Sequence, residues 1–337
     1  MTKHAPHDVE ALYVQQVSLR NEDPDAWDAQ ASLAGASLRS AHAHLSALDL
    51  KHLFRGTCKT YEVLATRPEG LVRVGHYTLI EHAGSREFYD GLCLPPEYQH
   101  LWPRALRAAL HIGGPGAYVY GWEWSLEPPR QGQLGLLEGA MVRSVVPITV
   151  NAVDFSRWPD WNSYSLAVSE NVRRNSRKAS VQFPRLKIDF AFGLDALGLA
   201  LPLTRLRRAM YRRKGLPFNS WKIAASYLAS FTTVPRQAQV GFAAEDGRVQ
   251  AIFRHVEFGP HTYYLDGATA AGSGGAGWRL MLTLLGRAFA RAPEGKLLLG
   301  YVYDSTRERL PDGLMRSRRS LRHSDWPTSI VAFDWRA

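Results

Sequence analysis

The same order of sequence patterns occurs twice in this chain, and this repeat limits the folds that the chain can adopt. In each copy, three segments rich in β-branched and aromatic residues precede a helical pattern and one more strand pattern. The first copy has strands at 60–66, 71–81 and 87–91, a helix at 96–112 and a strand at 117–123. The second has strands at 239–244, 249–258 and 262–267, a helix at 277–291 and a strand at 296–303. A repeat of this kind predicts two domains of similar fold.

The length and composition agree with two domains. A chain of 337 residues exceeds the usual size of a single hydrophobic core, and 45% apolar and 11% aromatic residues are sufficient to fill two. We predict an α/β (α+β) protein in which each domain is a mixed, twisted sheet flanked by helices. The predicted domains are 1–155, which begins with a short helical lead, and 156–337, which carries a basic helical insertion at 156–234.

Positive charge is concentrated in three short segments. The formal net charge is +10, and the basic clusters lie at 173–178, 205–214 and 316–322. Outside these clusters, acidic residues outnumber basic ones. Clustered positive charge favours a polyanionic partner such as a phosphorylated cofactor, a carrier protein or RNA, whereas a role in solubility alone is the alternative.

The first basic cluster belongs to a predicted amphipathic helix. At 100° per residue, one side of this helix carries Val168, Val172, Asn175 and Ala179. The other side carries four cations: Arg173, Arg174, Arg177 and Lys178. We expect the first side to pack against the protein and the second to face either solvent or a bound anion.

Nothing in the sequence indicates a metal site, a signal peptide or a membrane span. Cys58 and Cys93 have no metal-ligand spacing, and we expect reduced thiols. The first eight residues lack an apolar core, and the longest apolar run, 197–203, is short and contains a proline. We therefore predict a cytoplasmic protein without bound metal and without integral membrane contact.

Two motifs resemble those of a known family. Leu166-Ala-Val-Ser-Glu-Asn-Val-Arg-Arg-Asn-Ser-Arg-Lys-Ala179 is similar to a basic helix, and Tyr263-Tyr-Leu-Asp-Gly267 to a strand end, of the tandem GNAT-fold proteins. That family includes the Fem-type peptidoglycan aminoacyl transferases and the cellulose-associated (CelD- or BcsL-like) N-acetyltransferases. The order of elements extends the resemblance over roughly residues 25 to 335. It implies transfer of an acyl or aminoacyl group from a thioester or a tRNA ester to an amine or a hydroxyl.

The resemblance implies a site for the anionic part of the donor. A glycine-rich turn before the second long helix is suited to this role, because backbone N–H groups at a helix N-terminus bind phosphate. A flexible connection before the helix is the alternative. The turn lacks the Arg or Gln that usually precedes the glycines, and the C-terminal basic segment lacks the family's lysine-aromatic motif. The donor-binding candidates are Ser273, Gly274, Gly275, Gly277, Arg316, Arg318 and Arg319.

Candidates for proton transfer follow from position at strand ends. Tyr264 and Asp266 lie near the end of one strand, and Asp304 directly follows another. If the two strands flank a cleft, these side chains lie at its mouth. A role in turn formation or core packing is the alternative for each of them.

Three functions remain open from the sequence. The first is acyl transfer from acyl-CoA or an acyl-carrier protein to an envelope, polysaccharide or specialised-metabolite acceptor. The second is aminoacyl or peptide-bond-forming transfer from aminoacyl-tRNA, and the third is non-catalytic binding of RNA or a carrier by a degenerate GNAT pair. The residues expected to contact tRNA or another anion are Arg173, Arg174, Arg177, Lys178, Arg207, Arg208, Arg212 and Arg213.

Overall fold

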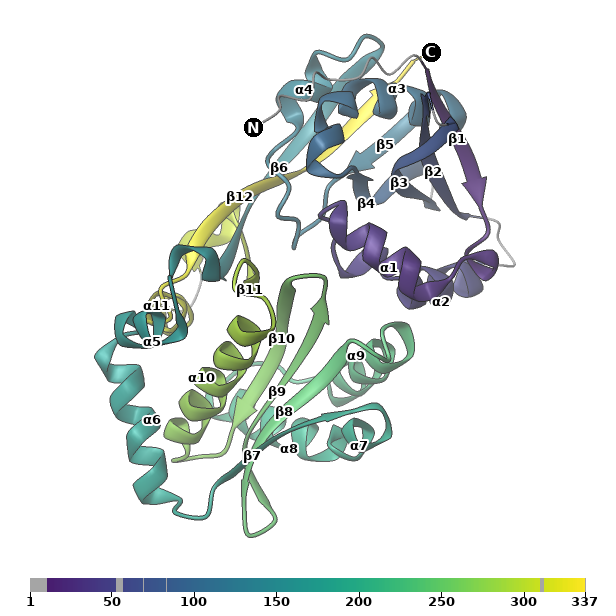
Figure 1. Cartoon of the computed structure of the whole chain (residues 1–337). Coiled ribbons are helices and arrows are strands. Elements are labelled where there is room, and N and C mark those ends of the chain that lie inside the picture. The colour runs from purple at the N-terminus through teal and green to yellow at the C-terminus, as the bar shows by residue number, and fades with distance from the viewer. Residues whose placement is uncertain (1–10, 53–56, 69, 83, 310–311, 337) are drawn as a thin grey trace. The chain divides into compact units, whose positions relative to one another are not determined.

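The chain forms two compact units. The computed structural model describes residues 11–52, 57–68, 70–82, 84–309 and 312–336 (Figure 1). Unit 1 comprises residues 1–148 and 327–337, and unit 2 comprises residues 149–326. The chain passes from one unit to the other within β6 (Ala140–Asp154) and again within β12 (Ser324–Trp335). The sequence-based division assigned 327–337 to the second domain, whereas these residues belong to unit 1 because β12 contributes buried apolar side chains to its core.

Unit 1 is a mixed sheet with helices. Its strands follow the order β1-β2-β3-β4-β5-β12-β6, and β4 and β5 are parallel whereas β1 to β4 are antiparallel neighbours. A core of aromatic and aliphatic residues, including Tyr77, Phe88, Trp102 and Phe333, lies between this sheet and α3. The elements are β1 (Leu12–Val17), α1 (Pro24–Leu33), α2 (His42–His52), β2 (Cys58–Arg67), β3 (Gly70–His82), β4 (Ser85–Cys93), α3 (Trp102–Gly113), β5 (Gly116–Tyr120) and α4 (Gln131–Gly135).

Unit 2 has the same kind of sheet and more helices. Its strand order is β6-β11-β10-β9-β8-β7, in which β10 and β11 are parallel. The elements are α5 (Trp161–Ala167), α6 (Glu170–Gln182), β7 (Lys187–Phe192), α7 (Gly193–Gly198), α8 (Ala200–Arg213), α9 (Ser220–Thr233), β8 (Ala238–Glu245), β9 (Arg248–Phe258), β10 (His261–Thr269), α10 (Gly274–Arg291), β11 (Lys296–Tyr303) and α11 (Asp312–Ser320).

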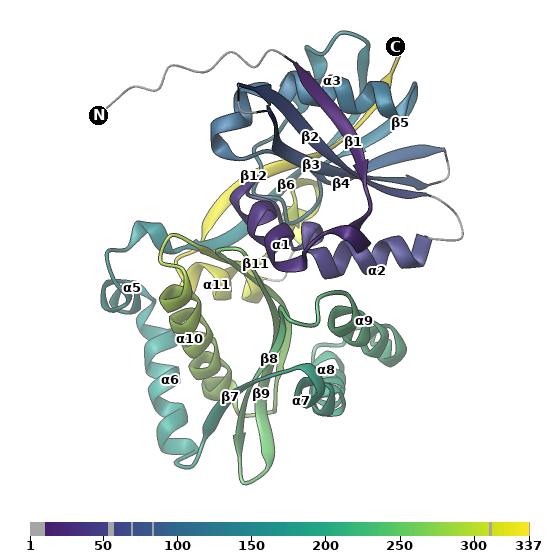
Figure 2. The same ribbon diagram turned by 45° about the vertical axis from the view of Figure 1, so that its right-hand side comes forward.

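Helices cover both faces of the sheet in unit 2. Figure 2 shows α6 and α10 on one face and α7, α8 and α9 on the other. The long helix α10 supports this arrangement because Ala276, Leu280, Leu284 and Ala288 recur every four residues and are fully buried. Residues that are close in sequence can therefore lie on opposite faces of this sheet.

The predicted repeat is confirmed. Three antiparallel strands, a helix and a strand parallel to the third occur as β2-β3-β4-α3-β5 and again as β8-β9-β10-α10-β11. The fold class is therefore the predicted one, with two similar units that each contain a mixed sheet flanked by helices.

Two predicted helices differ in detail. The helix expected at 96–112 begins as a 3-10 helix (Pro96–Leu101) before α3, and the basic helix is interrupted at Val168. Ser169 caps the second part, because its side chain accepts a hydrogen bond from the amide of Val172. Strands β1, β6, β7 and β12 were not predicted.

Candidate functional site

The parallel strands β10 and β11 separate soon after they begin. They pair only at Thr262 with Leu297 and at Tyr263 with Leu298, although both strands continue for several residues. Two irregularities coincide with the separation. A bulge interrupts the pairing of β10 with β9 between Tyr264 and Asp266, and Gly300 in β11 has a φ of 131°. The separation leaves a space between the two strands, and side chains from neighbouring elements line this space.

A cavity of about 300 Å³ lies at this position. Its walls come from β9, β10, α10, β11 and α11, and most of them are apolar. Apolar walls with a few polar groups are typical of small-molecule sites. The lining residues are Phe253, Tyr264, Thr269, Gly274, Gly277, Trp278, Met281, Leu299, Leu314, Ser317, Arg318 and Leu321.

Arg318 is a buried cation in this cavity. Its side chain is directed inward from α11, the residue is 8% exposed, and Nη1 donates a hydrogen bond to Oδ1 of Asn151 at 2.6 Å. Nδ2 of Asn151 in turn donates to Asp325 at 2.6 Å. The guanidinium occupies the space that a side chain at Gly300 would fill. Burial lowers the pKa of Arg318, but an arginine remains charged at neutral pH.

Tyr264 supplies the second polar group. Burial raises the pKa of its hydroxyl above the usual range, and the nearby charge of Asp266 adds to this shift while Arg207 and Arg318 oppose it. The hydroxyl therefore stays protonated at neutral pH and can donate a hydrogen bond. Its ring packs edge-on against Phe253, with centroids 5.2 Å apart. Tyr264 and Arg318 together make one end of the cavity polar.

The two carboxylates expected to share the site with Tyr264 lie elsewhere. Because of the bulge, Asp266 is directed toward α8 on the opposite face of the sheet, where Oδ2 forms ion pairs with Arg207 and, at 2.7 Å, with Arg254. Asp304 follows β11 and accepts a hydrogen bond from Thr149 at 3.2 Å. Neither residue lines the cavity.

The glycine-rich turn has a packing role as well as a place at the cavity. Gly274 and Gly277 line the cavity, but a Cβ at Gly277 would lie 2.6 Å from Thr269. A Cβ at Gly275 would lie 2.7 Å from the carbonyl oxygen of Asn175, so this glycine allows α10 to approach α6. Ser273 is fully buried, and its Oγ lies 2.9 Å from the carbonyl oxygens of Gln250 and Ala270. Of the four residues, Gly274 and Gly277 alone are exposed to the cavity.

The basic residues fall into separate places. Arg316 and Arg319 are exposed on α11 and do not line the cavity, in contrast to Arg318. On α6, Val172 and Ala179 are buried while Arg174, Arg177 and Lys178 are exposed, which confirms the predicted two-sided helix. Arg173 is half-buried.

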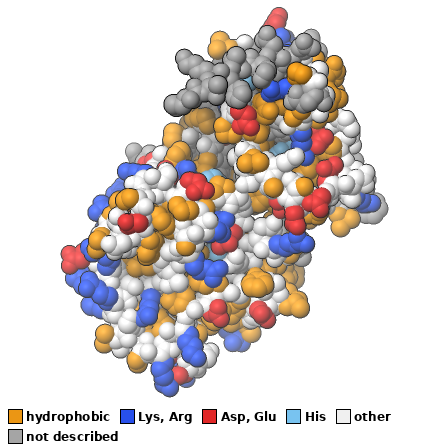
Figure 3. Space-filling view, viewed as in Figure 1, with side chains coloured by type: hydrophobic (Ala, Val, Ile, Leu, Met, Phe, Trp, Pro, Cys, Tyr) orange, Lys and Arg blue, Asp and Glu red, His pale blue; other side chains and the backbone are white. Residues whose placement is uncertain are grey.

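The remaining cations lie on α8, which covers the other face of the same sheet. Arg207 is used in the ion pair with Asp266, and Arg213 donates to the carbonyl oxygen of Thr269 at 3.1 Å. Arg208 and Arg212 are exposed. Figure 3 shows basic side chains gathered where α5 and α6 lie. The basic clusters of α6 and α8 thus lie on opposite faces of the sheet rather than on one surface.

In unit 1, a buried tyrosine lies at the end of the parallel strand pair β4 and β5. There β4 and β5 pair in parallel up to Phe88 and Tyr120. Beyond this point the Tyr120 hydroxyl accepts hydrogen bonds from the amide of Leu92 and from Nε1 of Trp102, both at 3.0 Å. It also lies 3.1 Å from the Glu127 carboxylate. The end of the parallel pair in unit 1 is thus held by hydrogen bonds of a buried tyrosine, whereas in unit 2 a cavity lies where β10 and β11 separate.

Sequence reasoning missed Asn151 and Gly300. A lone amide in the apolar run 148–153 was the available signal for Asn151, because a buried polar group in a strand needs a partner. A glycine after three leucines was the signal for Gly300, since glycine inside a strand often marks a close approach. The apolar lining residues had no signal that distinguishes them from ordinary core.

Comparison with known proteins supports the fold. No family model and no curated protein matches the sequence. Among solved structures, FemX is similar with a TM-score of 0.67 and 10% identity over 95% of this chain and 96% of that one. A conserved protein from Bacteroides thetaiotaomicron is similar with a TM-score of 0.57 and 9% identity over 97% of this chain and 100% of that one.

A further similar structure is the L-PGS of Bacillus licheniformis, with a TM-score of 0.50 and 11% identity over 94% of this chain and 93% of that one. At these identities the likeness shows the fold. The predicted resemblance to the Fem-type, tandem GNAT-fold proteins is confirmed at this level.

Two further observations concern the described residues. None of their helices has both the length and the apolar content that a membrane crossing requires. Their His, Cys, Asp and Glu side chains include no cluster of three or more that could hold a metal ion.

Proposed function

We propose that unit 2 transfers an acyl group from an acyl thioester, either acyl-CoA or an acyl-carrier protein, to an amine or hydroxyl. The observation that carries this proposal is the cavity where β10 and β11 separate, with apolar walls and a polar end formed by Tyr264 and Arg318. The apolar part suits an acyl chain, and the polar end suits a carbonyl group that becomes negatively charged during transfer. The proposed acceptor is an envelope precursor, a polysaccharide or a specialised metabolite.

The chemistry needs a stabilised oxyanion and a protonated leaving group. When the acceptor amine attacks the thioester carbonyl, a C–N bond forms and negative charge develops on the carbonyl oxygen. Arg318 is a fixed cation in a partly desolvated site, where charge stabilisation is strong. As the C–S bond breaks, the Tyr264 hydroxyl donates its proton to the thiolate, and the proton lost by the attacking amine passes through solvent to the tyrosinate, which restores the tyrosine.

Tyr264→Phe tests this assignment. It removes the hydroxyl and keeps the ring against Phe253. We expect kcat to fall by about 10²-fold or more, with KM for the donor almost unchanged, because the hydroxyl acts mainly in the transition state. The assay is mass spectrometry of the thiol and the acylated product with a panel of amines and acyl donors. Tyr211→Phe, on the opposite face of the sheet, is the matched control.

Gly274→Leu tests the cavity as the donor site. A Cβ at Gly274 meets no atom within 4 Å, and Gly274 lines the cavity, so we expect a leucine there to be tolerated and to reduce the space for a donor. Saturable binding of acyl-CoA or acyl-carrier protein should be lost in this variant. Unchanged donor binding would exclude the cavity. No binding and no turnover of any donor by the unmodified protein would favour the non-catalytic alternative.

One observation favours aminoacyl-tRNA as a second candidate donor. Arg177 and Lys178 on α6 are exposed and form no ion pair or hydrogen bond with a described residue, and exposed Arg174 contacts only Asn171. Unpaired cations on one helix face are suited to phosphates. FemX is the solved structure with the highest TM-score reported above. The sequence resemblance to Fem-type proteins implies an aminoacyl-tRNA donor.

Charge removal on the two faces of the sheet tests the tRNA donor. Replacing Arg174, Arg177 and Lys178 by alanine should weaken binding of charged tRNA and reduce the slope of log K against log salt by roughly 2–3. A second triple variant replaces the exposed Arg205, Arg208 and Arg212 on α8, two of which are themselves tRNA candidates, and shows on which face of the sheet the contact lies. Equal tRNA affinity for both triple variants and the unmodified protein would reject this role of α6.

A further inference from the structure

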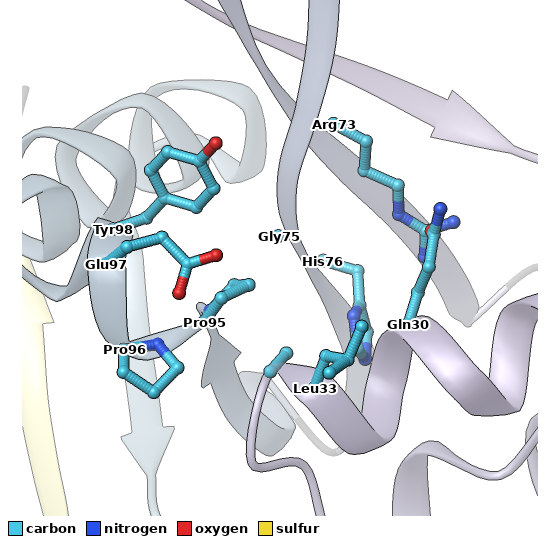
Figure 4. Close-up of a pocket in the computed structure, with 10 residues that line it drawn as sticks. Gln30, Leu33, Arg73, Gly75, His76, Pro95, Pro96, Glu97 and Tyr98 are labelled. Atoms are coloured by element: carbon cyan, nitrogen blue, oxygen red, sulfur yellow. The ribbon is translucent and has the colours of Figure 1, made fainter. Parts of the chain in front are cut away.

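Unit 1 contains a second cavity, of about 530 Å³, that the transfer reaction does not use. Helix α1 forms one wall, β3 forms the floor, and the segment that follows β4 forms the opposite wall (Figure 4). Leu33 comes from α1, Arg73 and His76 from β3, and Pro95, Glu97 and Tyr98 from the last segment. The volume is within the range of cavities that hold small ligands.

The positive charge at this cavity is already compensated. Arg73 forms an ion pair with Glu62 at 3.0 Å, and its guanidinium lies over the Trp27 ring, 4.2 Å from the centroid. Because both partners are fixed inside unit 1, Arg73 is poorly suited to hold the carboxylate or phosphate of a ligand.

The negative charge at the cavity has no such partner. Glu97 forms no hydrogen bond or ion pair with any residue that the structure describes, and its carboxylate points into the cavity (Figure 4). With Arg73 neutralised by Glu62, the lining has one uncompensated charge, and that charge is negative. Such a site favours a cation.

His76 contributes a buried, uncharged side chain to the floor of the cavity. The residue is 2% exposed, and its Nε2 is buried without a hydrogen-bond partner among the described residues. Burial, together with the charge of Arg73, lowers the pKa of His76 to about 3, so the imidazole is neutral at physiological pH. A neutral imidazole does not repel a cation bound in the cavity.

The remaining wall residues indicate what kind of ligand body fits the cavity. Leu33, Pro95 and Pro96 present apolar surface between the polar groups. The ring of Tyr98 is covered by the guanidinium of Arg67, 5.4 Å from its centroid, so the carboxylate of Glu97, not this ring, is the place for a cation. The cavity thus combines an acceptor for a positive charge with an apolar wall.

We propose that the unit 1 cavity binds a primary ammonium ion attached to a short apolar body, with the ammonium paired to Glu97 and the body against Leu33 and Pro95. This site is independent of the transfer proposed for unit 2, because its residues belong to unit 1 and its function is binding. Its test therefore needs no acyl donor, and it stands or falls separately from the proposed reaction.

Binding of three matched probes to the whole protein tests the proposal. The probes are phenethylamine, phenethyl alcohol and phenylacetate, which share a ring and differ in charge. For a ligand of this size, a Kd of about 1 mM is expected for the amine. We expect at least threefold weaker binding of the alcohol and still weaker binding of the carboxylate, measured by saturation-transfer NMR and calorimetry.

Two variants locate the binding in the cavity. Glu97→Gln removes the charge at an exposed position and should weaken amine binding about threefold or more. Leu33→Lys places a cation at the wall, where the side chain is 72% exposed and tolerates the change, and should abolish amine binding. Glu138→Gln and Leu50→Lys make the same changes at exposed positions of unit 1 outside the cavity and should leave binding unchanged.

Three results would overturn the proposal. The first is no saturable amine binding up to about 20 mM, beyond which a ligand of this size has no specific affinity. The second is equal or tighter binding of the alcohol or the carboxylate. The third is amine binding that neither Glu97→Gln nor Leu33→Lys changes relative to its matched control.

Discussion

Single residues decide where the chemistry of unit 2 can occur. Tyr264 and Asp266 are two positions apart on β10, and regular strand geometry would direct both to the same face. The bulge between them reverses this expectation, so Tyr264 lines the cavity while Asp266 pairs with Arg207 and Arg254 on the other face. A proton-transfer role for Tyr264 is therefore compatible with the geometry, and one for Asp266 at the same cavity is not.

One buried histidine, His255, makes the free energy of unfolding depend on pH in the acid range. It is fully buried in unit 2, and neither ring nitrogen has a hydrogen-bond partner among the described residues, although Glu257 lies 3.8 Å away. Burial, with Arg287 and Arg291 nearby, lowers the pKa of His255 to about 3. In the unfolded chain the pKa is about 6.5, so the unfolded state binds the proton first. The contribution of neutral His255 to the free energy of unfolding is thus fully present above about pH 6.5 and decreases as the pH falls toward 3.

His255→Leu tests this linkage. Between pH 7.5 and 5, one such histidine costs about 2 kcal/mol of unfolding free energy. We expect the leucine variant to lose about that much less stability than the unmodified protein over this interval, as measured by urea unfolding at both pH values. His100→Leu, at an exposed position, is the control and should keep the full acid sensitivity. Equal acid sensitivity of the two variants would contradict the prediction.

At the scale of elements, the approach of α6 to α10 explains part of the glycine-rich turn. The sequence suggests a phosphate-binding role for all the glycines, but the structure distinguishes them by their surroundings. Gly275 faces the backbone of Asn175 on α6, whereas Gly274 faces open space at the cavity. A motif can therefore combine one glycine that allows helix packing with another that leaves room for a ligand.

Alanine at the two adjacent glycines should have opposite effects on stability. Gly275→Ala forces a Cβ against a carbonyl oxygen 2.7 Å away, and the strain should cost about 1–3 kcal/mol. Gly274→Ala meets no atom within 4 Å and should be neutral or gain up to about 1 kcal/mol from helix propensity. Thermal unfolding measures both. A melting temperature of Gly275→Ala equal to that of Gly274→Ala would show that α6 does not constrain this position.

At the scale of the whole molecule, unit 1 is built from both ends of the chain, residues 1–148 and 327–337. The last strand, β12, brings Val331, Phe333 and Trp335 into the core of unit 1, more than two hundred residues after β5, with which it pairs. The C-terminal segment is therefore required for the stability of unit 1, although the sequence repeat groups it with the second half.

Phe333→Ala should destabilise unit 1 selectively. The side chain is fully buried, and its loss should cost about 3–5 kcal/mol. Hydrogen exchange measured by mass spectrometry should accelerate in β5, around Tyr118 and Tyr120, and stay slow in β10 of unit 2. Phe289→Ala in α10 is the control, with the reverse pattern expected because Phe289 belongs to the core of unit 2. Faster exchange in β10 but not in β5 after Phe333→Ala would refute this division.

The sequence by itself determined the elements of the repeat, the mixed-sheet fold class and the two-sided character of the basic helix at Arg174 and Arg177. These features depend on the period of apolar residues along the chain, which is a local property. It also indicated Tyr264, Gly274, Gly277 and Arg318, which the structure brings to one cavity. Only the tertiary structure decided that Asp266 and Arg207 pair on the other face, because a bulge and contacts between residues distant in sequence decide where a side chain points.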